Sequence, residues 1–181
     1  MAEQVFIVLF RGLNVGGRVA KMETLREALT AAGLGGVKTY IQSGNAVLTS
    51  DKSQAAVVEL IDTTFSAAFG YSSRPSVRSM KQWQRIIDEN PFAKVLKEGR
   101  LEHAVFLDAA PSADALAALQ KLATTEEMAL HDGVLYLYTP DGFGRSPVAA
   151  ALDRLLKVPL TARNWNTVLK LQEMAEAAAS S

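Results

Sequence analysis

The segments of this chain that favour strands and helices follow one order twice, and this repetition limits the possible folds more than any other feature. The first half predicts a strand, a helix, two strands joined by a turn, a second helix and a short strand. The second half predicts a strand, a helix, two strands and a helix, followed by a final helix. Two β-α-β-β-α units in series predict an α+β protein of two ferredoxin-like halves with antiparallel sheets. We place these halves at residues 1–96 and 97–181.

The expected elements have local causes in the sequence. Between Lys21 and Ala32 apolar residues recur at helical spacing, and Gly33 follows where a left-handed cap is favourable. Asp132-Gly133 predicts a hairpin turn. The expected strands are 5–10, 37–42, 46–50, 74–79, 103–108, 127–131 and 134–139, and the expected helices are 21–32, 53–69, 80–90, 112–123, 146–157 and one that begins near 164.

Three expected strands contain an uninterrupted apolar run, namely Val5–Phe10, Ala104–Leu107 and Val134–Tyr138. A sheet with one face in water alternates apolar and polar residues instead. Both faces of these strands are therefore expected to be covered. Either the two halves pack on one another, or a second subunit of a homo-oligomer supplies the cover.

Composition excludes several functions. The 181 residues include 19 basic and 19 acidic side chains, and this balance argues against a broad basic surface for nucleic acid or an anionic membrane. The absence of cysteine excludes disulfides, thiolate metal sites and a cysteine nucleophile. The two histidines, His103 and His131, lack ligand spacing, so we predict no metal site. With no export signal and no apolar stretch of roughly 20 residues, we expect a cytoplasmic protein without a membrane span.

The connection after the first strand, Arg11 to Arg18, contains three glycines, two arginines and one side-chain amide. In a β-α unit such a loop exposes backbone N–H groups beside a helix N-terminus, where a phosphate or carboxylate can bind. It has neither the dinucleotide fingerprint nor the P-loop spacing, so a tight connection with solvated arginines is the alternative. The candidate ligand-binding residues in this loop are Arg11, Asn14, Gly16 and Gly17.

A second polar segment, Gln42-Ser43-Gly44-Asn45, forms the turn of the first expected hairpin. On its own this segment is typical of a simple turn, because Gly and Asn tolerate positive φ. In a β-α-β-β-α-β unit, however, this turn and the loop after the first strand emerge at the same end of the sheet. Ser43, Gly44 and Asn45 would then share one rim with the Gly-rich loop. Amides and a guanidinium without cysteine or histidine favour recognition over catalysis.

A third polar cluster, Arg163 to Thr167, opens the final helix. Asn164 or Asn166 could serve only as a helix N-cap, and Trp165 could belong to the core. If the two halves face each other, this cluster adds a second guanidinium and an aromatic surface to the rim. Arg163, Asn164 and Asn166 are therefore further candidate ligand residues.

No catalytic residue is identified. Ser43 has no evident base partner, which disfavours nucleophilic catalysis from its hydroxyl. The adjacent carboxylates Glu126-Glu127 and Asp88-Glu89 lie on polar segments, and both pairs are interpreted as solvated charge.

At these clusters the chain resembles a widespread bacterial family known as domain of unknown function 1697. Arg11 to Gly17 resembles the family's opening motif, which more often has Ile where this chain has Leu13. Tyr40 to Asn45 resembles a second motif, Asn90-Pro91-Phe92 a third, and Thr161 to Thr167 the closing one. The resemblance covers most of the chain and implies a shared α+β fold, without an activity to transfer.

Together these features predict that a small anionic or phosphorylated ligand binds at the rim formed by the Gly-rich loop and the turn. The sequence does not identify a cofactor. An enzyme that acts on such a ligand by positioning and electrostatics is one alternative. RNA binding through aromatic residues of a ferredoxin-like sheet is a second, disfavoured by the absence of aromatics from Ala46 to Ser50 and by the zero net charge. A protein-interaction module is a third.

Overall fold

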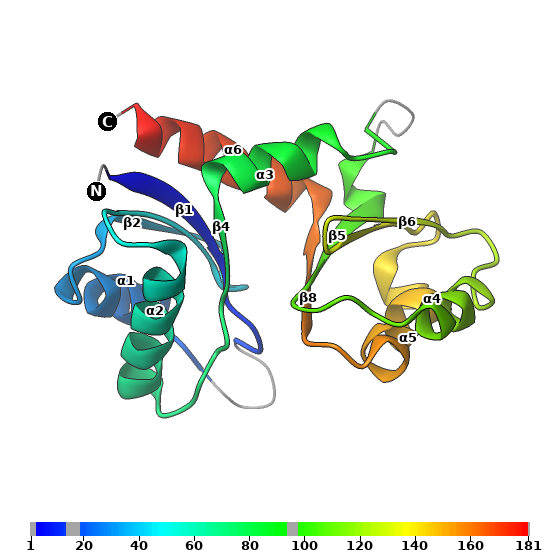
Figure 1. Ribbon diagram of the computed structural model, residues 1–181, viewed down its shortest axis with the longest axis horizontal. Helices are drawn as coiled ribbons and strands as arrows, with labels where there is room; N and C mark the ends of the chain where they lie inside the picture. The colour runs from blue at the N-terminus through cyan, green and yellow to red at the C-terminus, as the bar shows by residue number, and fades with distance from the viewer. Residues whose placement is uncertain (1–2, 14–18, 94–97, 181) are drawn as a thin grey trace. The chain divides into compact units, whose positions relative to one another are not determined.

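The computed structural model describes residues 3–13, 19–93 and 98–180 of the chain (Figure 1). The chain forms two compact units. Unit 1 comprises Met1–Arg85 and Lys170–Ser181, and unit 2 comprises Ile86–Leu169. The predicted boundary between residues 96 and 97 lies outside the described residues and stays a prediction.

Unit 1 contains a four-stranded sheet, sheet A, with the order β2-β3-β1-β4. β1 pairs antiparallel with β3 and with β4, and β2 pairs antiparallel with β3. This order is that of a β-α-β-β-α-β ferredoxin-like unit. In chain order its elements are β1 (Gln4–Leu9), α1 (Met22–Ala31), β2 (Gly35–Tyr40), β3 (Asn45–Ser50), α2 (Gln54–Phe69) and β4 (Ser76–Ser79).

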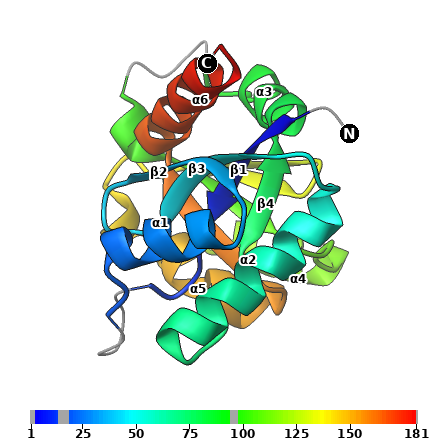
Figure 2. The same ribbon diagram turned by 90° about the vertical axis from the view of Figure 1, so that its left-hand side faces the viewer.

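Two helices contribute to both units, because the division of the chain falls within each of them. They are α3 (Met80–Asp88) and α6 (Trp165–Ala179). Figures 1 and 2 agree that, within unit 1, α1 and α2 cover one side of sheet A and the unit-1 parts of α3 and α6 lie on the other. The side-chain amide of Gln172 on α6 donates to Oε1 of Gln84 on α3 at 2.7 Å.

Unit 2 repeats the arrangement in sheet B, whose order is β6-β7-β5-β8 with antiparallel pairing throughout. Two short 3₁₀ helices, η1 and η2, flank its strands. In chain order the elements are η1 (Gly99–Leu101), β5 (Glu102–Leu107), α4 (Ala113–Gln120), β6 (Glu127–His131), β7 (Val134–Tyr138), η2 (Phe143–Arg145), α5 (Pro147–Leu156) and β8 (Leu160–Asn164). The predicted α+β class with two ferredoxin-like halves is confirmed.

β8 was absent from the sequence prediction, which began the final helix near 164. The strand pairs with β5 from His103↔Asn164 to Leu107↔Leu160. It is the last strand of the β-α-β-β-α-β order in unit 2 and forms an edge of sheet B. Its five residues alternate between half-buried and buried, so the strand follows the period-2 rule although it contains no continuous apolar run.

Local signals account for most element ends. The Ser53 hydroxyl accepts from the Ala56 N–H at 3.3 Å and caps α2, which ends at Gly70 in the left-handed conformation. Asp132 and Gly133 both have positive φ, 44° and 76°, as a tight hairpin turn requires. The predicted hairpin between β6 and β7 is therefore confirmed.

The central strands are buried on both faces, as their uninterrupted apolar character predicted. Phe6 and Val8 of β1 pack with the core beneath α1 and α2, while Ile7, on the opposite face, is also fully buried. In unit 2, Val105 packs beneath α4 and α5, while Tyr136 of β7 is fully buried next to Trp165, with ring centroids 6.1 Å apart. None of the helices in the described ranges combines the length and apolar character that crossing a membrane requires.

Candidate functional site

The described beginning of the Gly-rich loop adjoins the Ser43-Gly44-Asn45 bend at one end of sheet A. Leu9 of β1 lies opposite Asn45 of β3, and the Phe10 N–H donates to the Gly44 carbonyl at 2.8 Å. One residue later the Arg11 N–H donates to the Ser73 carbonyl at 3.2 Å. Three of the predicted loop residues, Asn14, Gly16 and Gly17, lie outside the described residues.

Gly44 occupies a position that a larger residue could not take without rearrangement. Its φ is 79°, in the left-handed region that favours glycine. A Cβ at this position would overlap Cδ1 of Leu13 and lie 3.0 Å from Cβ of Phe10. The bend is therefore packed directly against the beginning of the Gly-rich loop.

Asn45 holds the bend together from within. Its side chain is fully buried, and its amide group donates to the Tyr40 carbonyl at 3.2 Å and to Oγ of Ser43 at 2.9 Å. The two amide hydrogens thus serve the bend itself. This geometry gives Asn45 a structural role in addition to the ligand role that the sequence predicted.

The closing cluster belongs to unit 2. Nη1 of Arg163, a largely buried residue of β8, donates to Oγ1 of Thr161 at 2.7 Å and to the Ala162 carbonyl at 2.9 Å. Asn164 is the N-cap of α6, because its Oδ1 accepts from the Asn166 N–H at 3.0 Å. Its Nδ2 donates to the Arg100 carbonyl at 2.9 Å. Arg11 and the bend belong to unit 1, so a rim shared with this cluster stays a prediction.

A pocket of about 290 Å³ lies within unit 2, beside the N-terminal turn of α6. Of the predicted site residues only Asn166 lines it. A Cβ on Gly99 would overlap Oδ1 of Asn166, so the glycine permits the close approach of this side chain. The pocket is lined by Ile87, Ala93, Gly99, Glu102, Trp165, Asn166 and Leu169.

Glu102 is the unusual group of this pocket. The residue is 1% exposed, and its Oε1 has no hydrogen-bond partner in the described part of the chain. Burial raises the pKa of its carboxyl to about 7. A hydrogen bond with the side chain of Asn90 has the opposite, smaller effect on this pKa. Oδ1 of Asn90 accepts from the Phe92 N–H at 2.8 Å. The segments that resemble the third and closing family motifs therefore both supply residues around Glu102.

Sequence reasoning missed Glu102, because it interpreted the stretch before the strand at 103–108 as a boundary between halves. The available signal was a single carboxylate immediately before an apolar strand. Such a residue can lie at a solvated strand end or be drawn into the core, and only the tertiary packing distinguishes the two.

Glu126, interpreted from the sequence as solvated charge, is only partly buried and also accepts hydrogen bonds within the fold. Its carboxylate accepts from the Ser146 hydroxyl at 2.7 Å and from the Thr124 N–H at 3.0 Å. These hydrogen bonds, that from Ser146 above all, lower the pKa of Glu126 to about 2. Ser146 also caps α5 by accepting from the Ala149 N–H at 3.2 Å, so Glu126 anchors the start of that helix.

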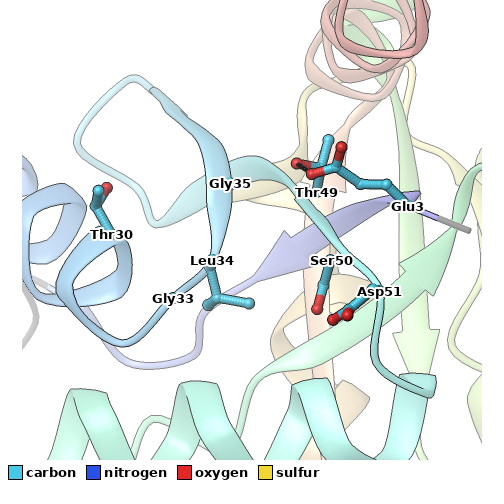
Figure 3. A pocket seen from close by; sticks show the side chains of 8 residues that line it. All are labelled: Glu3, Thr30, Gly33, Leu34, Gly35, Thr49, Ser50 and Asp51. Carbon is cyan, nitrogen blue, oxygen red and sulfur yellow. Dashed lines mark hydrogen bonds between the residues drawn. The ribbon is translucent and has the colours of Figure 1, made fainter. Parts of the chain in front are cut away.

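Unit 1 contains a larger pocket of about 530 Å³ beside the other end of β3 (Figure 3). Glu3 and Thr49 point toward one another there, and Oγ1 of Thr49 donates to Oε1 of Glu3 at 2.6 Å. No predicted site residue lines this pocket, and none of its described lining residues is basic. Nor do the described residues anywhere form a cluster of three or more potential metal ligands. The lining residues are Glu3, Thr30, Gly33, Leu34, Gly35, Thr49, Ser50 and Asp51.

Comparison with known proteins identifies a family of unknown function and a similar solved structure. The model of a family described as "Protein of unknown function (DUF1697)" matches residues 4–136, which include the loop, the bend and the Asn90-Pro91-Phe92 segment. The structure is similar to that of the conserved bacterial protein SP0830 from Streptococcus pneumoniae, with 26% identity and a TM-score of 0.78. That similarity covers 97% of this chain and 99% of the other. No curated protein matches the chain.

Proposed function

Because the chain belongs to the DUF1697 family of proteins of unknown function, we propose a function from its own residues: binding of a small anionic or phosphorylated ligand at the Gly-rich loop and bend of unit 1. The ligand contacts Arg11, Asn14, Gly16, Gly17 and Ser43, while Gly44 and Asn45 shape the bend. Arg163, Asn164 and Asn166 join the site if the protein brings its two units to one rim.

The observation that carries this proposal is the hydrogen bond from the Phe10 N–H to the Gly44 carbonyl, 2.8 Å long. It joins the segment that carries Arg11 to the segment that carries Ser43. A guanidinium and a hydroxyl from distant parts of the sequence therefore originate at the same end of sheet A.

The chemistry of these groups suits an anion. A guanidinium can donate two parallel N–H bonds to one carboxylate or phosphate, and these charge-assisted bonds are stronger than neutral ones. Hydroxyl and backbone N–H groups add neutral donors, which complete the coordination of a phosphate without further charge.

Thermal-shift and calorimetric titrations with inorganic phosphate, pyrophosphate, citrate and AMP at constant ionic strength test the proposal. We expect saturable stabilisation by at least one of these anions, since a ligand that binds only the folded state raises its stability. The stabilisation should be lost in Arg11→Gln. It should persist in Lys52→Gln, which removes one positive charge beyond the other end of β3.

A response that depends only on ionic strength, or one equal in both variants, would reject a site at Arg11. Two-dimensional NMR of the labelled protein gives the same answer without a variant. A specific anion should shift the backbone amides of Ser43 and Gly44 and leave those at the opposite end of β3 unchanged.

RNA binding by stacking on sheet A receives no support from the exposed surface. Phe6, the aromatic residue within β1, is 1% exposed, and β3 contains no aromatic residue. Recognition of unstacked bases by a ferredoxin-like sheet depends on aromatic side chains of its central strands being accessible.

A further inference from the structure

Glu102 is a buried acid that the fold leaves incompletely satisfied. It is the first residue of β5 and is 1% exposed, yet its Oε1 has no partner among the residues that the structure describes. A buried polar atom without a hydrogen bond destabilises the fold, so such atoms are rare in folded proteins. Glu102 is also one of the residues that line a cavity, and a donor that reaches its carboxyl from there would supply the missing hydrogen bond.

The cavity beside Glu102 has the character of a small-ligand site. Its volume of about 290 Å³ is close to the lower end of the roughly 300–1,000 Å³ that ligand pockets span. Ile87, Trp165 and Leu169 provide apolar walls, and Leu169 is 45% exposed. Asn166 adds one carboxamide. A few polar groups on an apolar wall are the usual composition of such pockets.

Within the described part of the chain, the pocket is lined by one ionisable side chain, the acid Glu102. None of the described residues that line it is basic, and nearby Arg100 pairs with the exposed Glu98 at 2.8 Å. A cation entering the pocket therefore gains from the ionised carboxylate of Glu102.

We propose that this pocket is a second ligand site, which binds a small organic cation with an N–H donor on an apolar body. The N–H group donates to Oε1 of Glu102, and the apolar body lies against Trp165 and Leu169. Primary ammonium, amidinium and protonated heteroaromatic groups belong to this class. The site does not include the loop and bend of unit 1, where the anion is proposed to bind, and it selects the opposite charge; Asn166 is a candidate residue of both sites.

Three probes of similar shape test the charge selection, namely benzamidine, benzamide and benzoate. The chain has two tryptophans, Trp83 in unit 1 and Trp165 in unit 2, so the indole N–H signals in ¹⁵N NMR spectra report the units separately. At pH 8 we expect benzamidine to shift the Trp165 signal saturably and to leave Trp83 unchanged. Benzamide should bind at least about tenfold more weakly, a loss of about 1.4 kcal/mol, and benzoate should not bind.

Two variants separate the role of Glu102 from a general charge effect. In Glu102→Gln the preference for benzamidine over benzamide should disappear, because the carboxylate that pairs with the cation is gone. Glu98→Gln removes an exposed carboxylate of the same unit and should keep the preference. Equal affinity for the three probes, or a preference that survives Glu102→Gln, would overturn the proposal.

A pH titration of the wild-type protein keeps the test decisive even if Glu102→Gln does not fold. The amidinium stays charged from pH 5 to 8, whereas Glu102 takes up a proton as the pH falls through about 7. Benzamidine affinity should then fall about tenfold for each pH unit below 7, while benzamide affinity should not. Benzamidine binding that is independent of pH, or no shift of Trp165 at millimolar benzamidine, would also overturn it.

Discussion

Glu102 and His103 are adjacent on β5 with side chains on opposite faces of sheet B, and each keeps one buried polar atom without a partner among the described residues. Burial raises the pKa of Glu102 to about 7 and lowers the pKa of His103 to about 4. Burial thus favours the uncharged form of both groups. Between pH 4.5 and 6.5, therefore, the folded state holds a proton on Glu102 and has given one up from His103.

These two shifts predict opposing effects of pH on the stability of unit 2. The pKa of Glu102 is raised, so its contribution is present below pH 4.5 and is lost as the pH rises to about 7. The pKa of His103 is lowered, so its contribution is present above pH 6.5 and is lost as the pH falls to about 4. Between pH 4.5 and 6.5 the contributions of this pair should largely cancel.

Single substitutions should show the pH dependence that each residue gives to the free energy of unfolding. The free energy of unfolding of Glu102→Gln should rise between pH 4.5 and 6.5, and that of His103→Gln should fall from pH 4.5 to 7, each by up to about 3 kcal/mol. Urea unfolding followed by the Trp165 indole signal measures both. The double variant should lose both slopes. A Glu102→Gln profile parallel to the wild type would show that Glu102 does not titrate in this range.

Substitutions of Asn45 test how much its hydrogen bonds stabilise the bend. Asn45→Ala removes donors to the Tyr40 carbonyl and to Ser43, and should cost about 1–3 kcal/mol of unit 1 stability. Asn45→Asp should cost more at neutral pH, because a buried carboxylate cannot donate to that carbonyl. Urea unfolding followed by the Trp83 signal measures both changes. Ser43→Ala, which removes the acceptor of one of these two Asn45 hydrogen bonds, is the control and should lose less than either.

Asn164 allows its capping role to be separated from its other hydrogen bond. Asn164→Asp keeps the oxygen that accepts from the Asn166 N–H but loses the donor to the Arg100 carbonyl. Asn164→Ala loses both. We expect the alanine variant to be about 1 kcal/mol less stable than the aspartate variant in urea unfolding, the usual value of an N-cap. Equal stabilities would show that the cap contributes nothing at this position.

Much of the fold could be predicted because its signals are local. Gly33, Gly70 and Asp132-Gly133 adopt the positive φ angles that their residue types favour, and they end or join elements where expected. β8 could not be predicted in this way. Its Thr-Ala-Arg-Asn stretch has no apolar run, and its extended conformation depends on pairing with β5, which lies far away in the sequence.

The candidate sites show a similar division between pattern and packing. The alternation of strands and turns was enough to predict that the Gly-rich loop and the bend emerge together. The direction of a side chain is not contained in that pattern, and so the inward amide of Asn45 was missed. The burial of Glu102 likewise depends on segments near 90 and 165 that approach one another only in the folded unit.

The contact between Gly44 and Leu13 predicts a difference between two glycine variants. Gly44→Ala and Gly12→Ala both place alanine at positive φ, 79° and 62°, at a cost of about 1–2 kcal/mol each. A Cβ on Gly12 meets nothing within 4 Å, whereas one on Gly44 overlaps Leu13 and should cost about 1–3 kcal/mol more. Urea unfolding followed by the Trp83 signal gives the difference.

Combining Gly44→Ala with Leu13→Ala should recover part of the extra loss, since the stability changes of two substitutions in contact are not additive. Equal losses for the two glycines, or additive losses in the double variant, would show that the bend does not depend on close packing against the loop.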